Sequence, residues 1–294
     1  MRNTFFQFLA RKYPTQLMDR SRFLSALWRV LFYVLRPNQP FEMRTRQYRL
    51  LAVPNRSNLT RAVIRRGYWE PLATEVFTEL LRPGSFVIDA GANFGHYALT
   101  AANIVGPNGF VVAFEPHAET YRLLSANAEL QTVGNLECVN AGLGDTNGEI
   151  TLYTDTENPG GHSFFEWNVR RSENSGHSVT VWALDNYLKD QAENRSVDVL
   201  KLDVQGFEMN VLNGARQTIE THKPAVLCEV TPDALRNAGT SHAELIQFFE
   251  EFNYRATIID STNDLLVAAS FDELINKLNT TEAEYFDVLF QPEF

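Results

Sequence analysis

Cysteine is scarce in this sequence, and the two that are present have no spacing that could form a structural framework. They are Cys138 and Cys228 among 294 residues, and each lies in an apolar, strand-like segment. Buried reduced thiols are the ordinary state of such residues, and neither a disulfide framework nor a zinc site has the spacing it requires. This composition fits a reducing compartment, and we expect a cytoplasmic protein, with association at a membrane surface left open.

Long apolar runs are also missing. The longest in the N-terminal part is FLSALWRVLFYVL, residues 23–35, which contains Arg29 and is 13 residues long. A bilayer span requires about 20 apolar residues, and no small-residue cleavage site makes this run a signal peptide. Aromatic and arginine residues would let it lie on a membrane surface. We favour a helix that packs on the rest of the chain or on a second subunit, which would give a homo-oligomer.

Charge is unevenly distributed along the chain. Residues 1–71 contain 14 Arg and Lys against 3 Asp and Glu, whereas residues 72–294 contain 12 against 33. A basic segment on an acidic body indicates an anionic partner for that segment, such as lipid, glycan or nucleic acid. No RNA-binding motif is evident, so nucleic acid is not the expected partner. We divide the chain into an arm over 1–70, with a helix and a short strand at 46–53, and a larger domain over 71–294.

The larger domain alternates strand-like and helix-like segments. A first helix begins at Pro71 and ends before Pro83-Gly84. The expected strands cover residues 85–90, 110–116, 135–142, 148–154, 178–184, 197–204, 224–230, 254–260 and 284–291, and the expected helices cover 95–105, 117–130, 208–221 and 241–252. Alternating strands and helices predict a mostly parallel sheet with helices on both faces, closed here by an antiparallel pair. Ligands of such sheets bind beyond the carboxyl ends of the strands.

The segment VIDAGANFGHYALT, residues 87–100, links the first strand of the larger domain to its helix through a glycine-containing turn. Glycines allow a sharp turn, and the first amides of the next helix point toward a ligand. The dinucleotide fingerprint requires its second glycine where the pyrophosphate contacts the backbone. Asn93 occupies that position here. The pattern therefore departs from a dinucleotide site where a pyrophosphate needs bare backbone.

The charges at the strand ends favour a cationic ligand. Glu115, 20 residues after Gly95, could bind ribose hydroxyls in either a dinucleotide or an S-adenosylmethionine (SAM) site. Asp89, Asp203 and Glu229 end other strands, and Lys201 is the only basic residue near them. SAM has a net positive charge, whereas a pyrophosphate is anionic, so this acidic set favours SAM. The closing antiparallel pair, in place of a second βαβαβ half, favours it as well.

A series of blocks in this sequence resembles the FkbM-type methyltransferases. They are VIDAGANFGHYALTAA, GFVVAFEPHAETYRLLSANAEL, VNAGLGDTNGEITLY, LDNYL, LKLDVQGFEMNVLNGA and PAVLCEV, in order, within residues 67–230. The resemblance implies the Rossmann-like, class I SAM-dependent methyltransferase fold, with a seven-stranded, mostly parallel sheet. It also implies methyl transfer to a hydroxyl, often on sugars, glycans or polyketides. Gln205 departs from the family, which often has Glu there.

The resemblance also implies the cofactor site. By position in the matching blocks, the SAM-binding residues would be Glu70, Asp89, Gly91, Asn93, Phe94, Gly95, Glu115, Pro116, Asn140, Gly142 and Asp145. Of these, Glu115 falls on the ribose acid, and Asn140, Gly142 and Asp145 fall beside the adenine. The hallmark block after the fourth strand contributes Asp203, Gly206 and Glu208.

Several residues are candidates for catalysis, since a sugar hydroxyl is a poor nucleophile that a general base or a metal would help. Asp203 is the first candidate because it ends a strand next to the expected position of the transferring methyl group. Glu208, Glu229 and His162 are the alternatives. Glu208 begins a helix, where an acid also stabilises the helix dipole. Asp203, Glu208 and Glu229 could together hold a divalent metal, but their spacing in the sequence does not decide whether they form a metal site.

His162 lies in a polar insertion over residues 155–178, near Phe164, Phe165 and Trp167. These aromatic residues could stack on a sugar ring, or they could pack against the sheet as in an ordinary surface loop. His96 follows the glycine turn and is expected to be a helix-start residue. The function that we expect is O-methylation of a hydroxyl on a sugar, glycan or lipid-linked saccharide. A dinucleotide-dependent oxidoreductase and a non-catalytic membrane- or anion-tethering protein are the alternatives.

Overall fold

The computed structural model describes Val30 and residues 40–45, 47–53, 62–63, 69–155, 161–169, 176–191, 195–280 and 283–293. The chain divides into two compact units, residues 1–69 and 70–294. In the first unit, β1 (Phe41–Arg44) pairs antiparallel with β2 (Arg49–Ala52), which confirms part of the strand expected at 46–53. The helix expected at 23–35 lies outside the described residues except for Val30. No helix in the described ranges has both the length and the apolarity of a bilayer span.

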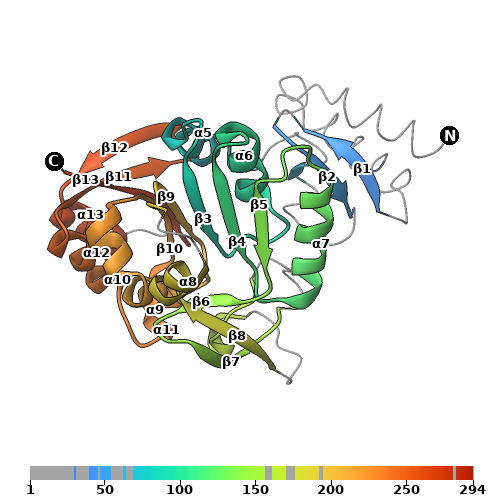
Figure 1. Ribbon diagram of the computed structural model, residues 1–294. Helices are drawn as coiled ribbons and strands as arrows, with labels where there is room; N and C mark the ends of the chain where they lie inside the picture. Colours follow the sequence, from blue (N-terminus) through green and yellow to red (C-terminus); the bar gives the residue numbers. More distant parts are fainter. Residues whose placement is uncertain are drawn as a thin grey trace. The chain divides into compact units, whose positions relative to one another are not determined.

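The second unit contains an eight-stranded sheet in the order β12-β11-β13-β10-β9-β3-β4-β5 (Figure 1). Its parallel strands are β3 (Phe86–Ala90), β4 (Phe110–Phe114), β5 (Leu136–Val139), β9 (Val199–Leu202) and β10 (Ala225–Val230). The antiparallel strand β13 (Phe286–Pro292) lies between β10 and β11 (Tyr254–Asp260). The mostly parallel sheet and its closing antiparallel pair are therefore confirmed.

The strand β12 (Leu265–Ala269) was not predicted, and it makes the sheet eight-stranded where seven strands were expected. It pairs antiparallel with β11 at the edge of the sheet. Leu265 and Leu266 are 55% and 51% exposed, so the segment has no alternation of buried and exposed residues that would have marked a strand. A turn with Asp264 at φ 56° joins the two strands.

Helices cover both faces of the sheet because alternate strand residues point to opposite faces. Val87 of β3 packs with α5 (Pro71–Leu80), α6 (His96–Val105) and α7 (Ala118–Glu129) on one face. Ile88 packs on the other face, which α8 (Leu184–Gln191), α9 (Glu208–Gly214), α10 (Arg216–His222), α11 (Pro232–Asn237), α12 (His242–Glu251) and α13 (Phe271–Thr280) cover (Figure 1). Because β3, β4, β9 and β10 pair in parallel, their carboxyl ends lie along one edge of the sheet.

The single helix expected over 208–221 is two helices in the structure. α9 ends at Gly214, and α10 begins at Arg216 after Ala215, whose backbone at φ −113° leaves the helical range. A Cβ atom at Gly214 would lie 1.9 Å from the carbonyl oxygen of Gly144. Close packing of α9 on the strand that contains Gly144 therefore accompanies the break, and this tertiary contact has no signal in the helical pattern.

The insertion before β9 forms a three-stranded sheet of its own. It contains β6 (Gly142–Gly144), β7 (Gly148–Leu152) and β8 (His177–Ala183), with the short 3-10 helix η1 (Glu166–Asn168) in the segment between β7 and β8. The strands expected at 148–154 and 178–184 are confirmed. A bridge between Tyr153 and Ser163 closes the base of the insertion and brings residues 161–165 back over the main sheet edge.

Candidate functional site

The glycine turn after β3 is shaped by neighbouring parts of the chain. Gly91 has φ 83°, and a Cβ there would lie 1.9 Å from the carbonyl oxygen of Asp203. A Cβ at Gly95, with φ 103°, would lie 2.8 Å from Leu124 Cδ1. Asn93 itself is left-handed, with φ 51°, a conformation that asparagine tolerates better than most residues. The glycines therefore allow the loops after β3 and β9 to touch and α6 to pack on α7.

The carboxylate of Glu115 joins the loops that follow β3 and β4. Its Oε2 accepts the backbone N–H of Asn93 at 2.9 Å, and its Oε1 accepts that of His117 at 2.9 Å. Asn140 Nδ2 donates to the carbonyl oxygens of Glu115 and Pro116 at 3.0 and 3.1 Å. Burial raises the pKa of Glu115 to about 7, against the lowering effect of the two N–H donors. Each carboxylate oxygen keeps a lone pair for a ribose hydroxyl.

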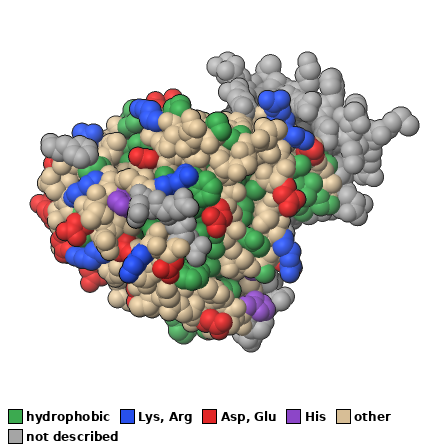
Figure 2. All heavy atoms as spheres, in the orientation of Figure 1, with side chains coloured by type: hydrophobic (Ala, Val, Ile, Leu, Met, Phe, Trp, Pro, Cys, Tyr) green, Lys and Arg blue, Asp and Glu red, His purple; other side chains and the backbone are tan. Residues whose placement is uncertain are grey.

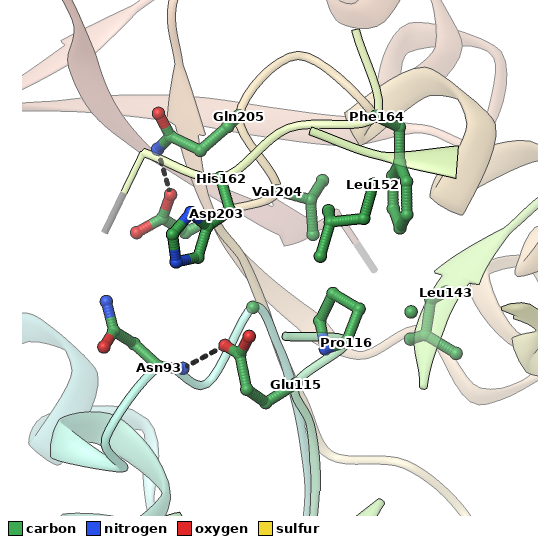
Figure 3. Close-up of a pocket in the computed structure, with 12 residues that line it drawn as sticks. Asn93, Glu115, Pro116, Leu143, Leu152, His162, Phe164, Asp203, Val204 and Gln205 are labelled. Atoms are coloured by element: carbon green, nitrogen blue, oxygen red, sulfur yellow. Dashed lines mark hydrogen bonds between the residues drawn. The ribbon is translucent and has the colours of Figure 1, made fainter. Parts of the chain in front are cut away.

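A cavity opens beside Glu115 at the carboxyl ends of the strands (Figure 3). Its lining consists of Gly91, Asn93, Glu115, Pro116, Gly142, Leu143, Leu152, His162, Phe164, Asp203, Val204 and Gln205. Figure 3 shows Asn93, His162, Asp203 and Gln205 toward one end, and Leu143, Leu152 and Phe164 toward the other. None of the described residues in this lining is lysine or arginine. An acidic end and an apolar end fit the charged and adenine ends of SAM.

The acidic side chains at this edge of the sheet lie mostly inside the protein. On the face that Figure 2 shows, acidic and basic side chains of the larger unit are interspersed. Inside, Asp89, Lys201, Glu229 and Asp287 lie on the sheet face that α5 and α6 cover, because each is two residues from an apolar residue of that face. Glu70, at the start of α5, accepts the Tyr97 hydroxyl at 2.9 Å.

Burial raises the pKa of several carboxyls here: Glu70 and Asp89 to about 7, and Asp287 to about 6. It raises that of Glu229 well above its ordinary value, helped by the charges of Asp203 and Asp287. Lys201 responds in the opposite way. Burial alone would lower its pKa, but Asp203, Asp287 and Glu229 together raise it above its ordinary value.

Asp203 and Glu229 are both half-buried, and one side chain connects them. Gln205 Nε2 donates to Asp203 Oδ1 at 2.8 Å and to Glu229 Oε1 at 3.1 Å. Asp203 also lines the cavity (Figure 3). Two of the catalytic candidates are thus brought together, and one of them, Asp203, lines the cavity.

The other acidic candidate, Glu208, contacts its own turn. It is buried, and its Oε1 accepts the backbone N–H groups of Val204 at 3.1 Å and Gly206 at 3.2 Å. Burial raises the pKa of Glu208 to about 7. These contacts give Glu208 a positioning role in the turn that carries Asp203. In the described ranges, no group of three His, Cys, Asp or Glu side chains has the geometry of a metal site.

His162 lies in the cavity wall. Its Nδ1 accepts the backbone N–H of Asp155 at 3.0 Å, and its ring lies 4.1 Å from that of His117. The aromatic residues that follow it separate into two groups. Phe164 and Phe165 pack on Phe207, with ring centroids 4.6 and 5.7 Å apart, so they are not free to stack on a sugar. Trp167 is 74% exposed and remains available.

Other residues predicted from the sequence lie outside the cavity lining. Asp145 is exposed at the turn after β6. Asp89 is buried, and within the described part of the chain its Oδ2 has no hydrogen-bond partner. Phe94 is buried, and its carbonyl accepts Asn127 Nδ2 at 2.8 Å. His96 is buried within hydrogen-bonding distance of Thr74, which agrees with its expected place at the start of α6. Burial lowers the pKa of His96 to about 3.

Sequence reasoning missed some residues of this site. Tyr97, Leu152 and Val204 belong to ordinary apolar patterns and carry no functional signal. Asp287 does carry one: it interrupts the apolar strand FDVLF, and it pairs in register with Glu229. A charged residue inside a closing strand could therefore have indicated the carboxylate cluster.

Comparison with known proteins identifies the family. The model of the Methyltransferase FkbM domain matches residues 89–256, which contain the turn after β3, Glu115, Asp203 and Glu229. This chain belongs to the FkbM methyltransferase family. Its larger unit has the mostly parallel sheet, covered by helices on both faces, that the resemblance to this family predicted, with β12 added at the sheet edge.

Two curated relatives are fungal. Methyltransferase 1 of Beauveria bassiana is 29% identical over 145 residues, which are 44% of this chain and 58% of that protein. Methyltransferase sdnD of Sordaria araneosa is 28% identical over 172 residues, 48% of this chain and 66% of that protein. The matched regions thus span less than two thirds of either relative.

Solved structures resemble the chain more distantly. The methyltransferase FkbM of Methylobacillus flagellatus KT is 13% identical with a TM-score of 0.44, covering 79% of this chain and 52% of that one. A SAM-dependent O-methyltransferase of Thermotoga maritima is also 13% identical, with a TM-score of 0.42 and coverage of 90% and 82%.

Proposed function

We propose that this protein transfers the methyl group of SAM to a hydroxyl on a sugar, glycan or lipid-linked saccharide. The observation that supports it most directly is the half-buried carboxylate of Asp203, which lines the same cavity as the ribose-binding candidate Glu115. When bound, SAM supplies an electrophilic methyl group. The chain's part is to align the acceptor hydroxyl in line with it and to remove the hydroxyl proton.

The residues have separate roles in this proposal. Glu115 and the backbone of Asn93 hold the ribose, and the apolar end formed by Leu143 and Leu152 holds the adenine. Asp203 accepts the proton of the attacking hydroxyl, since it is a carboxylate at the acidic end of the cavity. Glu208 keeps the backbone of residues 204–206 in place through its two accepted N–H groups.

The exposed Trp167 supports a saccharide as the acceptor. Its neighbour Asn168 donates to the carbonyl oxygens of Gln205 and Ala234 at 3.1 Å each, so η1 is fixed to the turn after β9. An exposed indole on a fixed helix offers a flat apolar face, and such faces bind the apolar side of a sugar ring. Trp167→Ala should weaken acceptor binding and leave cofactor binding unchanged.

The decisive test works with an acceptor of any identity. The full chain is titrated calorimetrically with S-adenosylhomocysteine (SAH), and then incubated with tritiated SAM and fractionated cell extract, after which the labelled molecule is identified. We expect SAH to bind and the label to enter a saccharide-containing fraction as an ether. Binding of NAD or NADP in place of SAH, seen as a ligand-dependent rise in Tm, would overturn the proposal.

A further inference from the structure

The side-chain amide of Gln205 makes two hydrogen bonds that constrain where a proton can reside. Its single NH2 group donates to Asp203 Oδ1 at 2.8 Å and to Glu229 Oε1 at 3.1 Å. An amide NH2 group has two hydrogens and no acceptor capacity, so each of the two oxygens must accept. A proton on either carboxyl is therefore favoured on Asp203 Oδ2 or Glu229 Oε2, the oxygens that do not accept from the amide.

The backbone that carries this amide is held from both sides. Gln205 is left-handed, with φ 52°, and its carbonyl oxygen accepts Ser163 Oγ at 2.8 Å and Asn168 Nδ2 at 3.1 Å. On the other side, Glu208 Oε1 accepts the N–H groups of the residues before and after Gln205. The amide is thus presented to the two carboxylates by a turn whose backbone is held by other contacts.

The surroundings of the pair contain more carboxyl groups than cations. The titratable groups around it are Glu70 of α5, Asp89 of β3, Glu115 after β4, Tyr97 of α6, Lys201 of β9, Glu208 of α9, Cys228 of β10, Asp287 of β13, Tyr285 just before β13, and His162 in the cavity wall beside Asp203. Asp287 is 3% exposed, and its Oδ1 has no hydrogen-bond partner among the residues that the structure describes. Burial and the charges of Asp203 and Asp287 raise the pKa of Glu229 well above its ordinary value. Glu229 therefore binds a proton more readily than an ordinary carboxyl does when no further cation lies above it.

We propose that Asp203, Gln205 and Glu229 form one proton-accepting unit for methyl transfer, in which Gln205 is the positioning residue. This inference rests on the proposed function. In the reaction the S–CH3 bond breaks with its electron pair left on sulfur, the O–CH3 bond forms, and the hydroxyl proton moves to a carboxylate oxygen that the amide leaves open. The positive charge that sulfur loses reappears as that proton, so the net charge of the site stays constant.

The unit should respond to the charge on the cofactor's sulfur. A sulfonium above the pair favours its ionised form, whereas the neutral sulfur of SAH does not, so the SAM complex holds fewer protons than the SAH complex. The affinity for SAM should then rise with pH relative to that for SAH, by up to about tenfold per pH unit over the range in which the SAH complex holds the proton and the SAM complex does not.

Calorimetry on the full chain tests this without an acceptor. SAM and SAH are each titrated in phosphate and in Tris buffer at matched pH values from about 6 to 8, and the buffer dependence of the heat gives the protons exchanged. We expect SAM binding to release up to about one proton more than SAH binding. Equal proton exchange for the two ligands across this range would overturn the inference. Absence of binding by both would instead overturn the proposed function.

Two variants test the role of Gln205. Gln205→Met removes the donors that stabilise the ionised carboxylates, and Gln205→Glu adds a third carboxylate, so both should move the pH-dependent step in the SAM/SAH affinity ratio upward, by about one pH unit for Met and more for Glu. The control Gln247→Glu makes the same charge change on the exposed side of α12 and should leave the step unchanged. Thermal unfolding confirms that each variant is folded. If the pH-dependent step in the SAM/SAH affinity ratio stayed in place in both variants, Gln205 would be excluded as the positioning residue. The comparison of SAM with SAH in the unaltered chain does not depend on these variants.

Discussion

Two groups of buried or half-buried carboxylates lie at the same sheet edge, and they are held in different ways. Glu115, after β4, accepts two backbone N–H groups whose positions the loops determine. Asp203 and Glu229, after β9 and in β10, share one side-chain amide and face further carboxyls. A carboxylate fixed by backbone donors suits recognition of an unchanging ligand group. In the pair, burial and the charges of Asp203 and Asp287 destabilise the ionised form of Glu229, which therefore binds a proton more readily.

The largest effect should come from the pair. Asp203→Asn removes the proposed base while keeping the size of the side chain, so methyl transfer should fall by about 10²–10⁴-fold, the usual contribution of general base catalysis. The Kd for SAH should change by less than about threefold. Single-turnover transfer from tritiated SAM and calorimetry with SAH measure the two quantities. A variant that keeps its transfer rate would remove Asp203 from the chemistry.

Loss of Glu115 should mainly weaken the binding of SAH. Glu115→Ala removes the acceptor for two ribose hydroxyls, and hydrogen bonds to a charged group contribute about 1.5–3 kcal/mol each, so the Kd for SAH should rise by about 100-fold or more. The control is Glu129→Ala, which makes the same substitution at an exposed residue of α7 outside the cavity lining and should change the Kd by less than about twofold. Similar Kd values for the two variants would contradict the assignment of Glu115 to the ribose.

Glu208 should affect stability more than chemistry. Glu208→Ala leaves the N–H groups of Val204 and Gly206 without their acceptor, which should lower the free energy of unfolding by about 2–3 kcal/mol in urea titrations. Glu208→Gln keeps an oxygen at that place and should retain most of the stability. If Glu208→Gln abolished methyl transfer in a fully stable protein, Glu208 would belong to the proton-transfer group instead.

The raised pKa of Glu115 should also make the stability of the folded chain depend on pH. Burial raises its pKa to about 7 in the folded chain, from an ordinary value of 4.5. The folded state therefore holds a proton that the unfolded state has released, and this stabilisation is lost as pH rises from about 4.5 to about 7. For the ligand-free chain we expect Tm to fall over that interval, with Glu115 contributing about 3 kcal/mol, and to fall less in Glu115→Gln. A Tm that rises with pH in both proteins would contradict the raised pKa.

The sequence alone determined the parts that depend on local pattern. Apolar runs alternating with helical segments predicted the mostly parallel sheet, and the closing pair of β11 and β13 followed from its two apolar strands. The glycine turn and the acids at the strand ends indicated the edge where the cavity lies. These features are readable because strand and helix periodicity, and the rule that ligands bind at carboxyl ends, depend on order along the chain.

The tertiary structure alone decided which of those residues act together. Phe164 became a core residue because it packs on Phe207, and Glu208 turned toward its own backbone. The approach of Gln205 to both Asp203 and Glu229, and of Asp287 to Glu229 across the antiparallel register, joins residues far apart in sequence. Such contacts have no local signal, since they arise only when strands pair and a turn is held in place by a distant loop.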